Sequence, residues 1–373
     1  MLEPNAVYVM HGNEPRAMVR EALERVGLSS HLKPSMSVAL KPNLVVPKPS
    51  SSGATTSAEL VEGTIEYLKK HDIHWICILE SSGVGHCTSE AYRISGMESV
   101  ARKHGVGLVD LKKEGSEEVR YGSFKTRVFK KIWEFDYLIN LPVVKAHSQT
   151  RITCALKNLK GLIPDEEKRR FHSAGLHKPV AYLSKIVPQD LVIADGIMGD
   201  LTFEEGGTPV AMNRILVARD PVLLDAYVCD SLGYRIDEVH HLSIASSLGV
   251  GKGDGRKPRI IELNKALRVP GVLRREKTVA SLARMIDDRE ACSTCYGSLI
   301  HALQRMKGKG KLSSIPEPLH IGQGYKDSSG KGIGIGHCAK GFSSQLQRCP
   351  PQAVEIVHFL EGLTKSARPN ERA

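Results

Sequence analysis

The sequence predicts an α/β fold in which a mostly parallel sheet is flanked by helices, followed by a smaller C-terminal module that carries cysteines. The prediction rests first on five short apolar runs, because continuous runs of four to eight apolar residues are typical of strands buried on both faces. Segments with helical spacing lie between these runs, and such alternation favours a parallel sheet. The expected strands are residues 37–40, 75–79, 137–144, 191–194 and 214–218.

The expected helices of the body are residues 57–70, 90–103 and 150–162. Thr56 or Ser57 is suited to cap the first of them, and Pro164 would end the third. Residues 112–130 begin with a charged stretch that has few apolar side chains. We expect a loop or hairpin there, at a break between two lobes of the body.

The charge distribution divides the chain into two parts. The protein has 373 residues and a net charge of +11, yet residues 1–250 hold 30 basic and 30 acidic side chains. Residues 251–373 hold 22 basic and 11 acidic side chains, so the whole excess lies there. We therefore predict an α/β body over residues 1–250 and a basic C-terminal module over residues 251–373. No apolar run approaches the ~20 residues of a membrane span, and no signal peptide is visible, which predicts a cytoplasmic protein without a membrane partner.

Polar side chains follow several of the predicted strands. In open α/β sheets, ligands bind beyond the carboxyl ends of the strands, so these groups suggest a site for a small anionic ligand. Each cluster alone also fits a simple strand end or a solvated basic face. The candidate anion-binding residues are Lys41, Asn43, Glu80, Arg151, Lys157, Asn158, Arg170 and Asp195, and the candidate catalytic residues for acid–base chemistry are Lys145, His147 and His172.

Four cysteines lie in the basic module: Cys292, Cys295, Cys338 and Cys349. The first two are separated by two residues, a spacing that turns both thiolates to one side of a tight loop. The last one precedes Pro350, as the final cysteine of bacterial ferredoxin motifs precedes a proline. A cytoplasmic protein has little use for structural disulfides, so we expect a metal centre, with unligated or redox-active thiols as the alternative. Four cysteines by themselves suit a [4Fe–4S] cluster and zinc almost equally.

A succession of motifs in the body resembles the family called domain of unknown function 362. The matching pieces are Lys41-Pro42-Asn43, Thr55-Thr56, Glu80-Ser81-Ser82, Asn140-Leu141-Pro142-Val143-Val144-Lys145-Ala146-His147, Ala155-Leu156-Lys157-Asn158-Leu159-Lys160-Gly161, Arg170-Phe171-His172, Asp195-Gly196-Ile197, and Asp220-Pro221-Val222 with Asp225-Ala226. The family is described as carrying an iron–sulfur centre on an attached cysteine region. The resemblance thus implies a [4Fe–4S] cluster on the four cysteines in preference to zinc, without implying a reaction.

Three functions compete at this point. The first is an iron–sulfur redox protein whose body binds a small anion and whose basic module docks an acidic electron-transfer protein. The second is a non-redox lyase or isomerase acting on a carboxylate or a phosphate. The third is nucleic-acid binding through the basic module, but aromatic residues make up only 5% of the chain, so stacking platforms for bases are scarce.

Overall fold

A computed structural model of the protein describes residues 2–147, 149–201, 209–252, 258–265, 281–316 and 318–366. The chain divides into two compact units, Met1–Arg274 and Arg275–Ala373. The first unit extends beyond residue 250, where the sequence placed the boundary, because strand β12 (Arg259–Glu262) pairs in parallel with β1 (Ala6–His11). The glycine-rich, charged stretch 249–258 predicts a linker at this boundary, and residues 253–257 of it lie outside the described residues.

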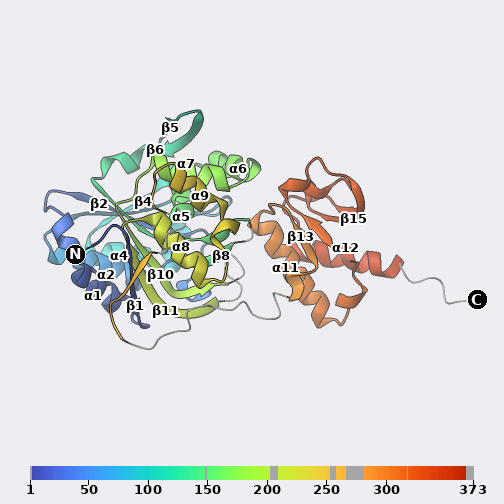
Figure 1. The fold of residues 1–373 in the computed structure, drawn as a ribbon, viewed down its shortest axis with the longest axis horizontal. Helices are drawn as coiled ribbons and strands as arrows, with labels where there is room; N and C mark the ends of the chain where they lie inside the picture. Colours follow the sequence, from blue (N-terminus) through green and yellow to red (C-terminus); the bar gives the residue numbers. More distant parts are fainter. Residues whose placement is uncertain are drawn as a thin grey trace, which may run out of the picture. The chain divides into compact units, whose positions relative to one another are not determined.

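A ten-stranded sheet, counted over the described residues, forms the centre of the first unit (Figure 1). Its main path runs β12-β1-β11-β10-β7-β2-β3-β4, with β8 pairing to β10 and β9 to β8. The remaining strands are β2 (Ser37–Pro42), β3 (Trp75–Glu80), β4 (Gly107–Asp110), β7 (Tyr137–Leu141), β8 (Val143–His147), β9 (Arg151–Thr153), β10 (Leu191–Asp200) and β11 (Pro209–Ala218). Most pairs are parallel, which confirms the α/β prediction, while β11 is antiparallel to both β1 and β10.

The order of the parallel strands creates a topological switch point between β2 and β7. From β2 the chain proceeds outward through β3 to β4, and from β7 it proceeds in the opposite direction to β10. Crevices at such points, beyond the carboxyl ends of the strands, are the usual binding places of open α/β folds. The carboxyl ends of β2 and β7 are therefore the place in this sheet where a ligand is expected.

Helices cover both faces of the sheet, each over its own apolar core. Val38 and Leu40 of β2 pack into one core and Ala39 into the other, as the alternation of side chains along a strand requires. The first core includes residues of α1 (Pro15–Val26), α2 (Ala58–Lys70), α3 (Thr88–Ser95) and α4 (Met97–His104). The second includes residues of α5 (Ala155–Asn158), α6 (Asp165–Ser173), α7 (His177–Ile186), α8 (Pro221–Ser231) and α9 (His240–Ser247).

Local predictions for the helices had mixed outcomes. Helix α2 is confirmed, and the Ser57 hydroxyl at its N-cap accepts a hydrogen bond from the Leu60 amide. The expected helix over residues 90–103 is divided into α3 and α4 at Gly96, whose φ of 83° is left-handed. The helix expected over residues 150–162 is wrong: the segment holds β9, the short α5 and a 3₁₀ turn at Leu159–Leu162. Residues 112–130 contain a β-hairpin of β5 (Ser116–Tyr121) and β6 (Phe124–Phe129).

The second unit contains a small parallel sheet in the order β13-β14-β15-β16. Its strands are β13 (Ile286–Asp288), β14 (Leu319–Ile321), β15 (Gly330–Ile335) and β16 (Phe342–Leu346), and helices α11 (Ser293–Gly308) and α12 (Ala353–Ser366) pack against each other. Short loops connect β14 to β15 and β15 to β16. Gly322 begins the first loop at a φ of +120°, where a Cβ atom would lie 2.1 Å from the Arg289 carbonyl oxygen. Within the described parts of both units, no helix is long and apolar enough to cross a membrane.

Candidate functional site

A buried ion pair lies at the carboxyl end of β2. Lys41 is fully buried, and its Nζ donates to Glu80 Oε2 of β3 at 2.7 Å and to the Pro42 carbonyl at 3.0 Å. Burial lowers the pKa of Lys41, and the charge of Glu80 opposes that shift. The backbone at Gly161 closes over this pair, because a Cβ there would lie 1.8 Å from Glu80 Oε1. Only glycine therefore leaves room for the pair.

Three asparagine side chains continue the network from β2 to β7. Asn43 donates to Asn158 Oδ1 at 2.8 Å, and Asn158 donates to Asn140 Oδ1 at 2.7 Å. Lys145 Nζ reaches the same group, donating to Asn43 Oδ1 at 3.0 Å and to the Ala54 carbonyl at 2.6 Å. The structure thus brings five candidate residues together: Lys41, Asn43, Glu80, Lys145 and Asn158. We call these five residues the switch-point network. All five are buried and hydrogen-bonded within the network, so they stabilise the carboxyl edge of the sheet.

Two buried carboxylates hold backbone amides beside this network. Asp195 accepts from the Ser57 amide at 2.7 Å and from the Ile197 amide at 3.0 Å, and burial raises its pKa. Asp225 of α8 accepts from the amides of Ala155 and Leu156, at 2.7 and 3.0 Å. Burial raises the pKa of Asp225 to about 7. Asp195 therefore anchors the start of α2. Asp225, which the sequence offered as part of a family motif but not as a site residue, anchors the start of α5.

Lys168 of α6 is a buried amine that the sequence did not reveal. Its Nζ donates to the Ser81 and Ser82 carbonyls at 3.1 and 2.7 Å and to Ser81 Oγ at 2.8 Å. Burial lowers its pKa to about 8, although Asp165 favours the charged form. Lys168 stands in the run Asp165-Glu166-Glu167-Lys168-Arg169-Arg170, which has the composition of a solvated helix face. No local signal separates it from its neighbours.

Two candidates lie apart from the network. Arg170 is partly exposed, pairs with Glu167 on its own helix and lies over the rings of Phe124 and Phe171. His172 is partly buried, and its Nε2 is 2.9 Å from Lys160 Nζ. Neither has a described contact with the five residues of the switch-point network.

The turn between β8 and β9 gathers the remaining candidates with further histidines. His147 Nδ1 accepts from the amides of Gln149 and Thr150, both at 3.0 Å, which leaves the proton on Nε2. Lys157 Nζ donates to Thr153 Oγ1 at 3.2 Å. We define the turn cluster as these groups and their neighbours: His147, Gln149, Arg151, Lys157, His177 and His241. His177 and His241 were missed as a pair, because 64 residues separate them.

The four cysteines of the second unit converge. Cys292 is the N-cap residue of α11, Cys295 lies in its first turn, Cys338 lies in the loop after β15, and Cys349 follows β16. Hydrogen bonding to Cys292, burial and the nearby thiols of Cys349 and Cys338 raise the pKa of Cys295. Burial and the same neighbours raise the pKa of Cys338. Gln323 Nε2 also donates to Cys292 Sγ at 3.5 Å. None of the four is in a disulfide, and Cys295 lies close enough to the other three for their thiols to affect its pKa.

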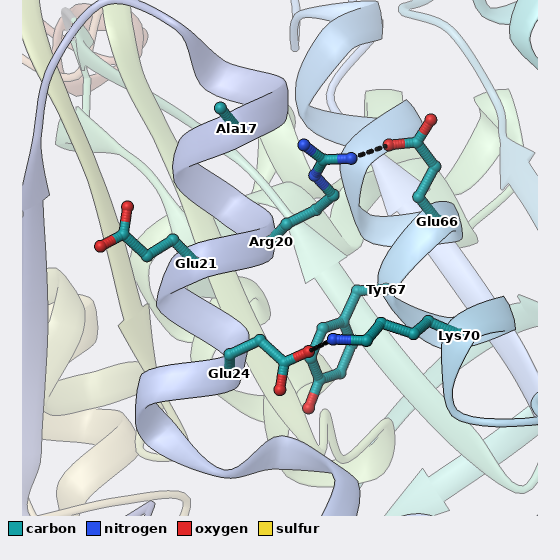
Figure 2. Close-up of a pocket in the computed structure, with 7 residues that line it drawn as sticks. All are labelled: Ala17, Arg20, Glu21, Glu24, Glu66, Tyr67 and Lys70. Carbon is teal, nitrogen blue, oxygen red and sulfur yellow. Dashed lines mark hydrogen bonds and ion pairs between the residues drawn. The ribbon is translucent and has the colours of Figure 1, made fainter.

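A surface depression between α1 and α2 has no link to these groups (Figure 2). Its charged side chains are paired across it, Arg20 with Glu66 and Glu24 with Lys70. Nearby, Glu62, Glu66 and His104 place three ligand atoms within 4.8 Å of one another. Arg16 and Lys103 already bind these carboxylates, so the group is an ion-pair network on the helix surface.

The comparisons with known proteins agree with the motif succession in the body. The model of the family Domain of unknown function (DUF362) matches residues 38–230, more than half of the chain. The chain belongs to this family. A thylakoid-associated protein of Synechocystis is 26% identical to this DUF362 protein over 237 residues, which are 58% of this chain and 69% of the relative.

Two solved structures were also matched. One is the lactate racemase apoprotein of Thermoanaerobacterium thermosaccharolyticum, at 14% identity and a TM-score of 0.37 over 55% of this chain and 54% of that one. The other is a protein of Thermotoga maritima, at 13% identity and a TM-score of 0.40 over 64% of this chain and 60% of that one. This chain therefore spans less than two thirds of either structure.

Proposed function

We propose that this DUF362 protein is an iron–sulfur protein with a redox role, in which Cys292, Cys295, Cys338 and Cys349 hold a [4Fe–4S] cluster. The observation that carries the proposal is the grouping of these four thiols, which come from three separate segments of the second unit. Grouped thiols raise one another's pKa because their thiolates repel, and a bound cationic centre removes that repulsion. When bound, a cluster of this kind supplies reversible one-electron transfer.

The preference for a cluster over a single zinc ion rests on the family resemblance, because four cysteines by themselves suit both centres. Cys295 lies within hydrogen-bond distance of Cys292, as the tight C-x2-C loop requires of either centre.

The charge of the second part of the chain suggests the kind of redox partner. Residues 251–373 carry 11 more basic than acidic side chains, while residues 1–250 are balanced. A basic surface attracts an acidic electron-transfer protein, and nearby cations favour acceptance of an electron. One relative is named for thylakoids. A cytoplasmic location for this protein stays a prediction.

The body would bind the small anionic ligand of the redox reaction. Support comes from basic groups at the carboxyl side of the sheet, where Arg151 and Lys157 lie beside the turn between β8 and β9. The switch-point network is a weaker candidate, because its polar groups bond to one another. This saturation also removes support from the alternative lyase or isomerase function, in which Lys145 would bind substrate directly.

The test is the metal and sulfide content of the full chain purified without oxygen. We expect about four irons and four sulfides per chain, absorbance near 400 nm and an electron paramagnetic resonance signal after reduction. Separate replacement of each of the four cysteines by serine should lower iron content, whereas C87S, at an exposed thiol of the body, should leave it unchanged. A colourless protein with one zinc and no sulfide would overturn the proposal.

A further inference from the structure

Gln323 is a buried amide side chain that faces one of the four cysteines. It is 8% exposed and lies at the start of the 3₁₀ turn Gln323–Tyr325, in the loop after β14. Its Nε2 donates to Cys292 Sγ at 3.5 Å. Hydrogen bonds to the sulfur ligands help to set the properties of a metal centre. A side chain outside the four cysteines therefore contacts a sulfur of the proposed centre.

The backbone holds Gln323 against the residues that lead into Cys292. The Gln323 amide donates to the Glu290 carbonyl at 3.1 Å. One residue earlier, Gly322 approaches so closely that a Cβ there would lie 2.1 Å from the Arg289 carbonyl oxygen, and its φ is +120°. Only glycine permits this approach. The segments that carry the donor and the sulfur are thus packed directly against each other.

Lys326 determines which end of the Gln323 amide faces the sulfur. Its Nζ donates to Gln323 Oε1 at 3.2 Å. An ammonium group can only donate, so the amide oxygen faces Lys326 and the NH₂ group faces Cys292. The charge of Lys326 also reaches a second cysteine. Burial and the thiol of Cys292 raise the pKa of Cys338, and Lys326 opposes that rise.

Reduction would strengthen both interactions. One electron from an external donor adds one negative charge, part of which lies on the cysteine sulfurs. A hydrogen-bond donor or a cation beside these sulfurs interacts more strongly with the reduced form than with the oxidised form. Groups that favour the reduced form raise the reduction potential. Removal of the Gln323 amide or of the Lys326 charge should therefore make the protein harder to reduce.

We infer that Gln323 and Lys326 raise the reduction potential of the centre held by the four cysteines, Gln323 as a donor to the sulfur of Cys292 and Lys326 by orienting the Gln323 amide and adding a positive charge. Both are positioning residues, since neither is a metal ligand. The inference rests on the proposed iron–sulfur function and deepens it, because it assigns two residues that tune how readily this protein accepts an electron.

The first experiment is a redox titration of the full chain purified without oxygen, followed by absorbance near 400 nm and electron paramagnetic resonance. Q323L removes the donor and keeps a side chain of similar size. Its reduction should be about tenfold less favourable, which is a potential about 59 mV lower for one electron. Q345L changes an exposed glutamine of β16 and should leave the potential unchanged. A potential in Q323L equal to or above that of the wild type would overturn the inference.

The second experiment compares two lysine variants that each remove one charge from an exposed position, K326M and K331M. It also decides the question if Q323L loses iron, because Lys326 contacts Gln323 from the exposed side. K326M should lower the potential more than K331M, and the difference should persist at high salt, where the direct effect of an exposed charge is screened. Equal potentials for the two variants would refute the role of Lys326.

A double variant tests whether Lys326 acts through Gln323. In the Q323L background, K326M should lower the potential less than it does in the wild type, because the amide that it orients is gone. Full additivity would contradict the orienting role. Iron and sulfide contents are measured for every variant. A wild type without a cluster counts against the proposed function, whereas a normal cluster with an unchanged potential in Q323L counts against this inference alone.

Discussion

Replacement of Glu80 by glutamine should destabilise the body strongly at neutral pH. Lys41 is fully buried and Glu80 is 3% exposed, so the pair is nearly free of solvent screening. Glutamine keeps an acceptor for the Ser81 amide, which Glu80 Oε1 binds at 2.7 Å. It replaces the oxygen facing Lys41 with a neutral amide, and the ammonium loses its counter-charge.

The size of the effect follows from the separation of the two charges. At 2.7 Å, the attraction is about 6 kcal/mol with an effective dielectric constant of about 20. Measured losses on removing one partner of a buried pair are about 3–5 kcal/mol, because the protein relaxes and the remaining group changes its protonation. For a body of this size, each 1 kcal/mol shifts the unfolding midpoint by about 2–4 °C. We therefore expect a midpoint about 6–20 °C lower.

The pH dependence of stability distinguishes loss of the Lys41–Glu80 ion pair from poor packing of the glutamine side chain. Burial lowers the pKa of Lys41, so the unfolded chain holds its proton at pH values where the folded variant tends to release it. Stability of E80Q relative to the wild type should therefore increase as pH rises toward the ordinary lysine pKa near 10.5. E118Q, at an exposed pair with Arg120, is the control and should change little. Equal midpoints for E80Q and the wild type at pH 7, or a deficit that does not change with pH, would refute the reasoning.

Two further substitutions test the surroundings of this pair. G161A should cost about 1–3 kcal/mol, because its Cβ would overlap Glu80 Oε1, and its effect should add less than fully to that of E80A, which removes this oxygen, in a double-mutant cycle; full additivity would count against the contact. Asp225, with its pKa raised from 3.8 to about 7, holds a proton in the folded chain that the unfolded chain releases, so wild-type stability should fall relative to D225N as pH rises from about 4 to 7. Thermal unfolding midpoints of both proteins across this pH interval measure the difference. If the two curves of midpoint against pH are parallel, the pKa of Asp225 is not raised.

The strands of the body were predictable because their physical signal is local. Runs such as residues 75–79 and 191–194 are apolar on every position, and both are central strands. The segment 150–162 was misread because its helical spacing competes with tertiary pairing. Arg151 adopts a φ of +64°, and Arg151–Thr153 pairs with β8. The positions of β1 and β12 depend on pairings across more than 200 residues, which no local pattern contains.

The candidate site shows why polar motifs alone do not separate scaffold from binding site. Lys41, Asn43, Lys145 and Asn158 stood out because polar groups recur at strand ends, and the structure does bring them together. Their polar groups already form hydrogen bonds with one another, so a ligand that binds there would first have to break these hydrogen bonds. Gln149 and His241 drew no attention in the sequence, yet their buried atoms lack partners. Unsatisfied hydrogen-bonding groups of this kind arise only when the chain folds, so no sequence pattern could have shown them.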